Sequence, residues 1–463
     1  MPLAPGTGGA YLGVDPLGAL VTAPATPAAA PSRGRLLQIL GVAFGLAVII
    51  GNTIGIGILR TPGEVAARLP EPAWFLGAWL VGGVYALLGA LTLAELGAMV
   101  PRSGGQYVFA RRALGDYAGF VIGWSDWIST CGSMAVVTIS IGEYLGVLVP
   151  ALAPFAVAVA VGVTFLFAGI HGLGIRTGDL TQQVTSLLKV VLLVGLAVAC
   201  LVAVAPERPT AAAVAHAAPG LTAVIVALQG VIYTYDGWNG MLYFSGEVRD
   251  PGRQIPRAMA GGVALIIVIY LLLNLAYMRV LPLSQMAGQT LVAATAAGVL
   301  FGSAGETAVR VVLILSLLSA ASAILLMGSR VPHAMSEDGL FWAGARRVST
   351  GGSPLATLVF TAVITTGMLV TGTFDQVLAV TAFFFVLNYL LSFISVIVLR
   401  RREPDTPRPY RALGHPIVTW LLVLGSVGFL AGNVIGDPAN TRWAVGLLLL
   451  SYPVFRMTVR SGG

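Results

Sequence analysis

Hydrophobic stretches of roughly 20 residues recur along almost the whole chain, and short loops rich in Arg, Asp, Pro and Gly separate them. Each stretch is long enough to cross the ~30 Å hydrocarbon core of a bilayer as an α-helix. The runs are continuously apolar instead of alternating, which favours helices over the strands of a membrane barrel. The pattern predicts an all-α integral membrane protein with twelve transmembrane helices, at residues 37–60, 74–100, 115–146, 151–170, 180–204, 221–246, 257–281, 305–329, 355–371, 376–400, 417–436 and 443–459.

Glycine and short polar residues interrupt two of these helices. The first contains IIGNTIGIGILRTPG at residues 49–63, and the sixth contains GVIYTYDGWNGMLYFSGEV at residues 230–248. An isolated glycine pair such as Gly51 and Gly55 usually marks close helix packing. Here the interruptions occupy corresponding positions in two consecutive five-helix units, which indicates a transporter with inverted repeats and a site at mid-membrane. Unwound N–H and C=O groups must line a cavity there, because lipid offers them no partner.

Composition and charge agree with a membrane protein and narrow its partners to lipid and small solutes. Hydrophobic residues make up 57% and charged residues 10% of the 463 residues, and the mean hydropathy is +0.89. Most of the 26 Lys and Arg residues fall in loops on the side of the N-terminus, which predicts cytoplasmic N- and C-termini in a multi-pass protein of the cell membrane. The net charge of +7 follows from this bias and predicts no nucleic-acid partner.

The rest of the composition predicts few accessory groups. Residues 1–35 are rich in Pro, Ala and Gly and are expected to form a disordered cytoplasmic tail. Cys131 and Cys200 fall inside predicted spans, and the four histidines are scattered, so we expect neither a metal site nor a cofactor. Neither cysteine lies in an outer loop where a disulfide could link a partner, so a single-pass accessory subunit is not expected.

Five segments resemble, in order and spacing, the amino acid permeases of the amino acid, polyamine and organocation superfamily. They are GNTIGIGILRTPG (51–63), AELGAMVPRSGGQYVFARRALG (94–115), YDGWNGMLYFSGEVRDPGRQIPRAM (235–259), SRVPHAMSEDGLF (329–341) and LRRREPDTPRPYRALGHP (399–416). The chain looks most like the branch that contains the light subunits of heteromeric amino acid transporters and their bacterial relatives. The resemblance implies the five-plus-five leucine-transporter fold for a permease domain over 36–458, with repeats at 36–204 and 220–400 and extra helices at 416–459.

The resemblance also implies a site for free amino acids at the two breaks. A zwitterion needs donors for its carboxylate and acceptors for its ammonium, and the ends of unwound helices supply both. The N–H groups expected to bind the carboxylate are those of Gly55, Ile56 and Gly57. The carbonyls expected to accept the ammonium belong to Thr53, Ile54, Tyr233, Thr234 and Asp236. The third, eighth and tenth spans are expected to complete the walls from GWSDWISTCGSM, SLLSAASAILL and TAFFFVLNY.

Two positions in this site need separate comment. Ile56 stands where the family has a serine, so the backbone donors are kept while a hydroxyl is lost. Tyr233 matches the family's aromatic residue that covers the substrate from outside, and its alternative is a packing or interfacial tyrosine.

Acidic residues inside the spans carry further hypotheses. An aspartate near mid-membrane costs ~2.5–3.5 kcal/mol on insertion scales, so Asp236 should face the interior. It either lies beside the substrate side chain and favours cationic substrates, or it is the N-cap of the half-helix that begins with GWNGMLYF. Glu95 and Glu143 are expected to be structural, and for Asp126 a structural and a functional role are equally favoured.

Lys189 is the only lysine of the chain. It matches the family's fifth-helix lysine, which lies where sodium-coupled relatives of the fold bind sodium. The alternative is a lysine whose ammonium extends to the membrane edge. An ammonium that bonds to carbonyls near Gly51 would make transport independent of sodium.

These features predict a secondary active transporter of free amino acids that works by alternating access, without sodium, as an exchanger. Proton-coupled symport is the alternative, and polyamine or organocation transport is a weaker one because a polyamine has no carboxylate for the first break. An enzyme is not favoured, since the chain has no GxSxG, HExxH or His-rich set. A channel would not need two matched broken helices.

Overall fold

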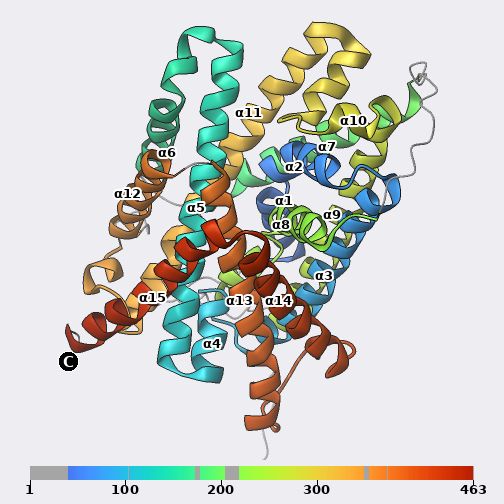
Figure 1. Cartoon of the computed structure of the whole chain (residues 1–463). Coiled ribbons are helices and arrows are strands. Elements are labelled where there is room, and N and C mark those ends of the chain that lie inside the picture. Colours follow the sequence, from blue (N-terminus) through green and yellow to red (C-terminus); the bar gives the residue numbers. More distant parts are fainter. Residues whose placement is uncertain are drawn as a thin grey trace, which may run out of the picture. The chain divides into compact units, whose positions relative to one another are not determined.

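The computed structural model describes residues 40–102, 104–172, 178–203, 218–348, 354–372 and 374–461, all within the unit Gln38–Gly463. The tail expected at residues 1–35 lies outside the described residues. All the elements of the described part are helices, with η denoting a 3-10 helix, and loops and one isolated β-bridge between Leu40 and Val248 connect them (Figure 1). Its helices are α1 (Val42–Thr53), α2 (Ile56–Arg68), α3 (Pro72–Met99), α4 (Gln106–Leu114), α5 (Asp116–Leu148), η1 (Pro150–Phe155), α6 (Ala156–Gly172), α7 (Gly178–Val202), α8 (Leu221–Tyr235), η2 (Gly240–Glu247), α9 (Pro251–Val280), α10 (Leu283–Met286), α11 (Val292–Glu337), η3 (Ala343–Arg346), α12 (Leu355–Thr371), α13 (Phe374–Arg402), α14 (Ile417–Gly436) and α15 (Pro438–Ser461).

Seven of the described helices are long and apolar enough to cross a membrane, or eight if the bent pair α1 and α2 is one span. Two shorter apolar helices, Val190–Val202 and Leu355–Thr371, add to these. The protein is therefore a helical, multi-pass membrane protein, and the count of twelve spans stays a prediction.

The predicted ranges differ from the helices in several places. Helix α11 starts well before the expected residue 305 and ends beyond 329, because it continues through a kink at Gly302. Gly302 has a φ of 68°, which glycine adopts without a steric penalty. The short helices α4 and α10 have no apolar run of membrane length, and the hydrophobic pattern therefore missed them.

The first expected helix breaks where its sequence predicts. Helices α1 and α2 meet at an angle of 44°. Between them, Ile54 (φ −79°, ψ 89°) and Gly55 (φ −134°, ψ −148°) leave the helical region of backbone space. Helix α2 then runs on to Arg68, eight residues beyond the predicted end.

The sixth expected helix breaks differently. Helix α8 ends at Tyr235, and Gly237 follows with a φ of 104°, a conformation that a side chain would strain. The chain then continues as the 3-10 helix η2 and not as the second α-helical half of the span predicted to end at residue 246. A 3-10 helix has poorer hydrogen-bond geometry than an α-helix, so the second break is the less regular one.

Helix α5 packs against α4, α6, α11 and α13, while α9 packs against α1, α3 and α7 (Figure 1). Two ends of the helix bundle serve as reference below. The α4 end carries α4 and the ends of α11 and α13, where Asp338 pairs with Arg102 at 2.7 Å. The α10 end carries the other end of α5, where the Tyr144 hydroxyl donates to the Thr290 carbonyl at 3.3 Å.

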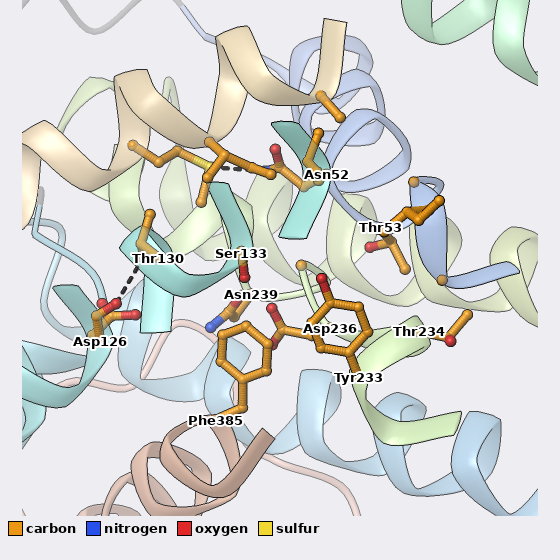
Figure 2. A pocket seen from close by; sticks show the side chains of 18 of the residues that line it. Asn52, Thr53, Asp126, Thr130, Ser133, Tyr233, Thr234, Asp236, Asn239 and Phe385 are labelled. Carbon is orange, nitrogen blue, oxygen red and sulfur yellow. Dashed lines mark hydrogen bonds between the residues drawn. The ribbon is translucent and has the colours of Figure 1, made fainter. Parts of the chain in front are cut away.

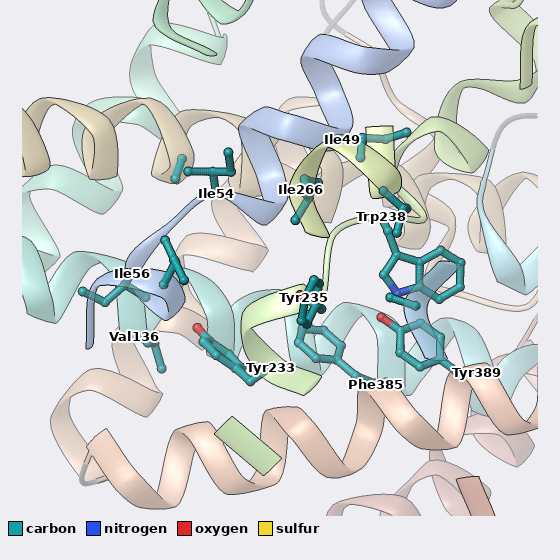
Figure 3. Packing of buried hydrophobic residues seen from close by; sticks show 14 of the residues in the cluster. Ile49, Ile54, Ile56, Val136, Tyr233, Tyr235, Trp238, Ile266, Phe385 and Tyr389 are labelled. Carbon is teal, nitrogen blue, oxygen red and sulfur yellow. The ribbon is translucent and has the colours of Figure 1, made fainter. Parts of the chain in front are cut away.

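Buried apolar and aromatic side chains surround both breaks (Figure 3). Helices α2 and α8 pack closely at two glycines. A Cβ on Gly57 would lie 2.7 Å from Thr234 Oγ1, and one on Gly230 would lie 2.9 Å from Thr61 Cγ2. Thr234 Oγ1 also donates to Thr61 Oγ1 at 2.9 Å. Helix α2 of the first break and helix α8 of the second are thus held together without space for a larger residue.

Glu95 and Glu143 make the structural contacts that the sequence predicts. The Glu95 side chain is 1% exposed and binds Arg400 at 2.5 Å and Arg408 at 3.2 Å. It also accepts the Ala412 N–H at 2.7 Å, so it joins α3 to α13 and to the loop after it. Glu143 lies 3.6 Å from Arg60 and is 44% exposed. A buried carboxylate with three partners is well compensated, whereas the exposed pair contributes little.

Candidate functional site

A cavity of about 70 Å³ lies where the two breaks meet (Figure 2). This volume has room for several water molecules or a small solute. The lining residues come from α1, α2, α5, α8, η2, α11, α13 and the loop before η2. They are Asn52, Thr53, Gly55, Ile56, Gly57, Asp126, Thr130, Ser133, Val137, Tyr233, Thr234, Asp236, Gly237, Asn239, Tyr243, Ala320, Ile324, Met327 and Phe385. All the site residues predicted from the breaks line it, except Ile54.

Two polar atoms of the first break lie at this cavity without a partner. Asn52 Oδ1 and Thr53 Oγ1 are buried and accept or donate no hydrogen bond within the described structure. The amide nitrogen of Asn52 is used, because it contacts Met327 Sδ at 2.8 Å. Buried polar atoms normally have partners, so these two favour a polar ligand in the cavity.

The hydroxyl of Tyr270 joins the two breaks. It comes from α9 and lies 2.6 Å from the Thr53 carbonyl and 3.0 Å from the Thr234 carbonyl. The Thr53 carbonyl also accepts the Gly55 N–H at 3.0 Å. Both lone pairs of the Thr53 carbonyl are therefore in use, and so is one expected donor, the Gly55 N–H. Thr234 keeps the better remaining acceptor for an ammonium, and Ile56 and Gly57, in the first turn of α2, keep the better donors.

The N-cap interpretation of Asp236 is wrong. Asp236 is the C-cap of α8 and has extended backbone angles (φ −59°, ψ 154°). The next helix begins only at Gly240, after Asn239, because the chain turns at Gly237. The Asp236 carboxylate instead lines the cavity and accepts a hydrogen bond from the Tyr389 hydroxyl of α13.

Asp126 is a second acidic residue at the same cavity. It lies on α5 and is 4% exposed. Both of its carboxylate oxygens lie near the Tyr243 hydroxyl of η2, at 2.7 and 2.8 Å. Asp126, Thr130, Ser133 and Val137 line the cavity at helical spacing, so one face of α5 forms a wall. This position favours a role at the site over a purely structural one.

An aromatic pair closes another side. Tyr233 of α8 stacks on Phe385 of α13, with ring centroids 6.2 Å apart and planes inclined by 27°. Tyr233 is 8% exposed, so it lies inside the protein and not at the membrane interface. Tyr233 lines the cavity (Figure 2), and its role of covering a substrate stays a prediction.

Lys189 lies on α7, which packs against α1. Its side chain is outside the part that the structure describes. The prediction that its ammonium reaches the first break therefore stays a prediction.

Sequence reasoning missed several lining residues. Asn52 sits inside the first quoted motif, but nothing local indicates that its oxygen is left without a partner. Thr130, Ser133 and Phe385 belong to segments expected to supply walls, and only the helix orientation selects them from their neighbours. Tyr270 carries no sequence signal, because α9 contains another buried tyrosine, Tyr277.

A cavity between two broken helices, inside a bundle of membrane-crossing helices, defines a membrane transporter for a small solute. Comparison with known proteins makes the class specific. The model of the amino acid permease family matches residues 40–452, and the chain belongs to this family.

The matches to three relatives extend over most of this chain and most of each relative. The chain is 28% identical over 430 residues to the serine/threonine exchanger SteT of Bacillus subtilis, covering 90% of this chain and 95% of that protein. It is 27% identical to the b(0,+)-type amino acid transporter 1 of Rattus norvegicus, covering 92% and 88%. It is 27% identical to the large neutral amino acids transporter small subunit 2 of Homo sapiens, covering 94% and 83%. The protein is thus an amino acid transporter of the membrane and not an enzyme.

Proposed function

We propose that this protein is a sodium-independent exchanger of free amino acids that works by alternating access. The observation that carries the proposal is the cavity at the two helix breaks. Its lining residues can offer backbone N–H donors to a carboxylate and backbone carbonyls to an ammonium. The name of the relative SteT, a serine/threonine exchanger, supports exchange over one-way uptake. The serine, threonine and large neutral amino acids in the relatives' names are the first substrates to test.

The proposed topology has twelve spans, ten of them in two inverted repeats at 36–204 and 220–400 and two extra helices at 416–459. Helices α1 with α2, and α8 with η2, are then the equivalent broken spans. The α4 end, which carries Arg111, Arg112 and Arg400 to Arg402, would be cytoplasmic, as would both termini, in the cell membrane. No disulfide-linked partner is part of this proposal, and the two cysteines are buried and free.

In the proposed complex the substrate carboxylate lies at the start of α2, at the N–H groups of Ile56 and Gly57 and close to Gly55. The positive end of the α2 dipole favours an anion there. The ammonium lies between the Thr234 carbonyl of the second break and the unpaired Asn52 Oδ1, and the Asp236 carboxylate lies beside the substrate side chain. Tyr233 covers the substrate.

Proton-coupled symport is the second candidate, and one observation favours it. Asp126 and Asp236 bring two carboxylates to one small cavity, each bonded to a tyrosine hydroxyl. A zwitterionic substrate supplies only one ammonium, so the second charge could be matched by a proton or by a cationic side chain.

Counterflow in proteoliposomes separates these candidates. Labelled serine should enter vesicles preloaded with unlabelled serine and should not accumulate in empty vesicles with an imposed inward proton gradient. Accumulation driven by the proton gradient alone would contradict exchange.

Replacing sodium by choline should leave exchange unchanged, and Lys189→Ala should severely impair it. A steep sodium dependence of the unmodified protein would remove the proposed role of Lys189. Sodium independence with an active Lys189→Ala variant would keep the function and make Lys189 a bystander.

A further inference from the structure

Three side chains form a layer between the cavity and the α4 end. We call Phe44, Phe244 and Arg330 the inner layer. Phe44 of α1 packs edge-on against Phe244 of η2, with centroids 5.2 Å apart. The Arg330 guanidinium of α11 lies over the same Phe244 ring, 4.3 Å from its centroid. Elements of both broken helices and of α11 therefore meet at one point.

The inner layer adjoins the cavity directly. Met327 lines the cavity, and Arg330 follows it by one turn of α11 towards the α4 end. Phe244 is the neighbour of Tyr243, which also lines the cavity. A solute that leaves the cavity between η2 and α11 towards the α4 end must therefore pass Arg330.

The guanidinium of Arg330 has unused hydrogen-bonding capacity. Its Nη1 atom is buried and has no hydrogen-bond partner in the described structure. No carboxylate of the described residues lies within 4.0 Å of it, although Glu247 at the end of η2 attracts it electrostatically. A ring face satisfies part of the charge but accepts none of its five N–H groups well. A buried donor without a partner is costly, so this arrangement favours a transient ligand.

We infer that Arg330 is a second binding site, on the path between the cavity and the α4 side, for the α-carboxylate of the substrate. The inference rests on the proposed function. The planar fork of a guanidinium matches a carboxylate, and the Phe244 ring holds the fork in place. When α1 and η2 separate from α11, Arg330 Nη1 becomes exposed to the path of the solute. A substrate that enters from the α4 side then binds Arg330 before it binds the start of α2, and a substrate that leaves to that side binds Arg330 afterwards.

A site on one side of the cavity predicts a one-sided effect. Substrate that enters from the α4 side meets Arg330 first, whereas substrate that enters from the α10 side meets the cavity first. Loss of a charge-assisted contact changes an affinity about tenfold or more. Arg330→Gln should therefore raise the KM measured from the α4 side about tenfold and change the KM from the α10 side less than about twofold.

The experiment measures exchange of labelled serine, with saturating unlabelled serine inside, in right-side-out and in inverted membrane vesicles. Arg330→Lys keeps the charge without the fork and should give an intermediate KM from the α4 side. Arg310→Gln is the matched control, because Arg310 lies on the same helix, pairs with Glu306 and is remote from the inner layer. Its KM should match that of the unmodified protein from both sides.

Each result bears on the inference separately from the proposed function. If the unmodified protein shows no exchange in either vesicle, the proposed function fails. If it exchanges but Arg330→Gln changes both KM values equally, or neither, the inference is overturned. Glu247→Gln with the same one-sided rise in KM would also overturn it, because Arg330 would then act through its charge neighbour. An Arg330→Lys variant that is as impaired as Arg330→Gln from the α4 side alone would support recognition by the guanidinium fork and not by charge alone.

Discussion

The two breaks occupy corresponding places in the sequence, yet they contribute different chemistry to the cavity. The first is short, lies between two α-helices and offers mainly backbone groups around Gly55 and Gly57. The second is longer, continues as a 3-10 helix and brings the side chains of Asp236, Asn239 and Tyr243 to the cavity. The difference suggests a division of labour. Every amino acid has the carboxylate that the first break suits, whereas the side chains of the second break can distinguish one substrate from another.

Changes at the first break should therefore affect all substrates, and Gly57 should be the most sensitive position. A Cβ at Gly57 would lie 2.8 Å from Thr234 Cα, which is backbone and cannot move aside. Gly57→Ala should abolish transport of every substrate, measured as exchange per amount of protein in the membrane. Gly55→Ala is the matched control, because the nearest atom to its Cβ is Asn52 O at 4.0 Å. It should keep exchange within about threefold.

Gly55→Leu tests the backbone site more directly. Its larger side chain would block the approach of the carboxylate to the start of α2, so binding should be lost although Gly55→Ala binds. Equal activity of Gly57→Ala and Gly55→Ala, or unchanged affinity in Gly55→Leu, would place the site elsewhere.

Changes at the second break should alter the ranking of substrates. Asp236→Asn removes the charge, so exchange of arginine and lysine should fall at least about tenfold relative to that of serine. A competition assay with labelled serine measures the ranking. Tyr389→Phe removes the hydroxyl that donates to Asp236 but keeps the carboxylate, so the ranking should be kept. Equal loss of all substrates in Asp236→Asn would remove the proposed division between the breaks.

Much of this site could be predicted from sequence, because glycine and short polar residues within an apolar helix indicate a break in that helix. The first break at Ile54 and Gly55 follows from them directly. The role of Asp236 could not be predicted, because it depends on where the flanking helices end and begin. Helix α8 ends at Tyr235, directly before Asp236, and η2 begins only at Gly240. The sequence of a helix without a polar stripe does not show which side faces the cavity. The contact of the Tyr270 hydroxyl with the first break could therefore not be predicted from the sequence.

Ile56→Ser should have a small effect. Ile56 is 3% exposed at the start of α2, and serine restores the hydroxyl that the resembled family carries there. The backbone N–H groups stay in place, so the KM for serine should change less than about threefold. A larger loss with unchanged protein yield would mean that the Ile56 side chain, and not its backbone, contributes to binding.

Asp338 lies outside both breaks and serves as a negative control. Partial burial would raise the pKa of Asp338, but hydrogen bonds from Arg102, Tyr107 and Arg111 lower it below its usual value. The carboxylate therefore stabilises the folded state above its unfolded pKa of about 3.9, and this contribution is lost as the pH falls through the lower folded value.

Asp338→Asn should lower the Tm at pH 7 by about 1–2 °C and leave substrate ranking and KM unchanged. The Tm difference from the unmodified protein should disappear on acidification below the folded pKa of Asp338, measured by thermal unfolding in detergent. An altered substrate ranking in this variant would show that ranking does not report on the second break alone.

The hydroxyl of Tyr270 lies near two carbonyls, one from each break, but it owns a single hydrogen atom. The Thr53 carbonyl is the nearer acceptor, at 2.6 Å against 3.0 Å for the Thr234 carbonyl, so the Thr234 carbonyl keeps capacity for a further donor. An ammonium that binds the Thr234 carbonyl donates a hydrogen bond to it, and the Tyr270 hydroxyl then donates to the Thr53 carbonyl alone. The empty and the loaded cavity thus differ in how the Tyr270 hydroxyl is shared between the two carbonyls. A solute without an amino group would leave the Thr234 carbonyl without a full hydrogen bond.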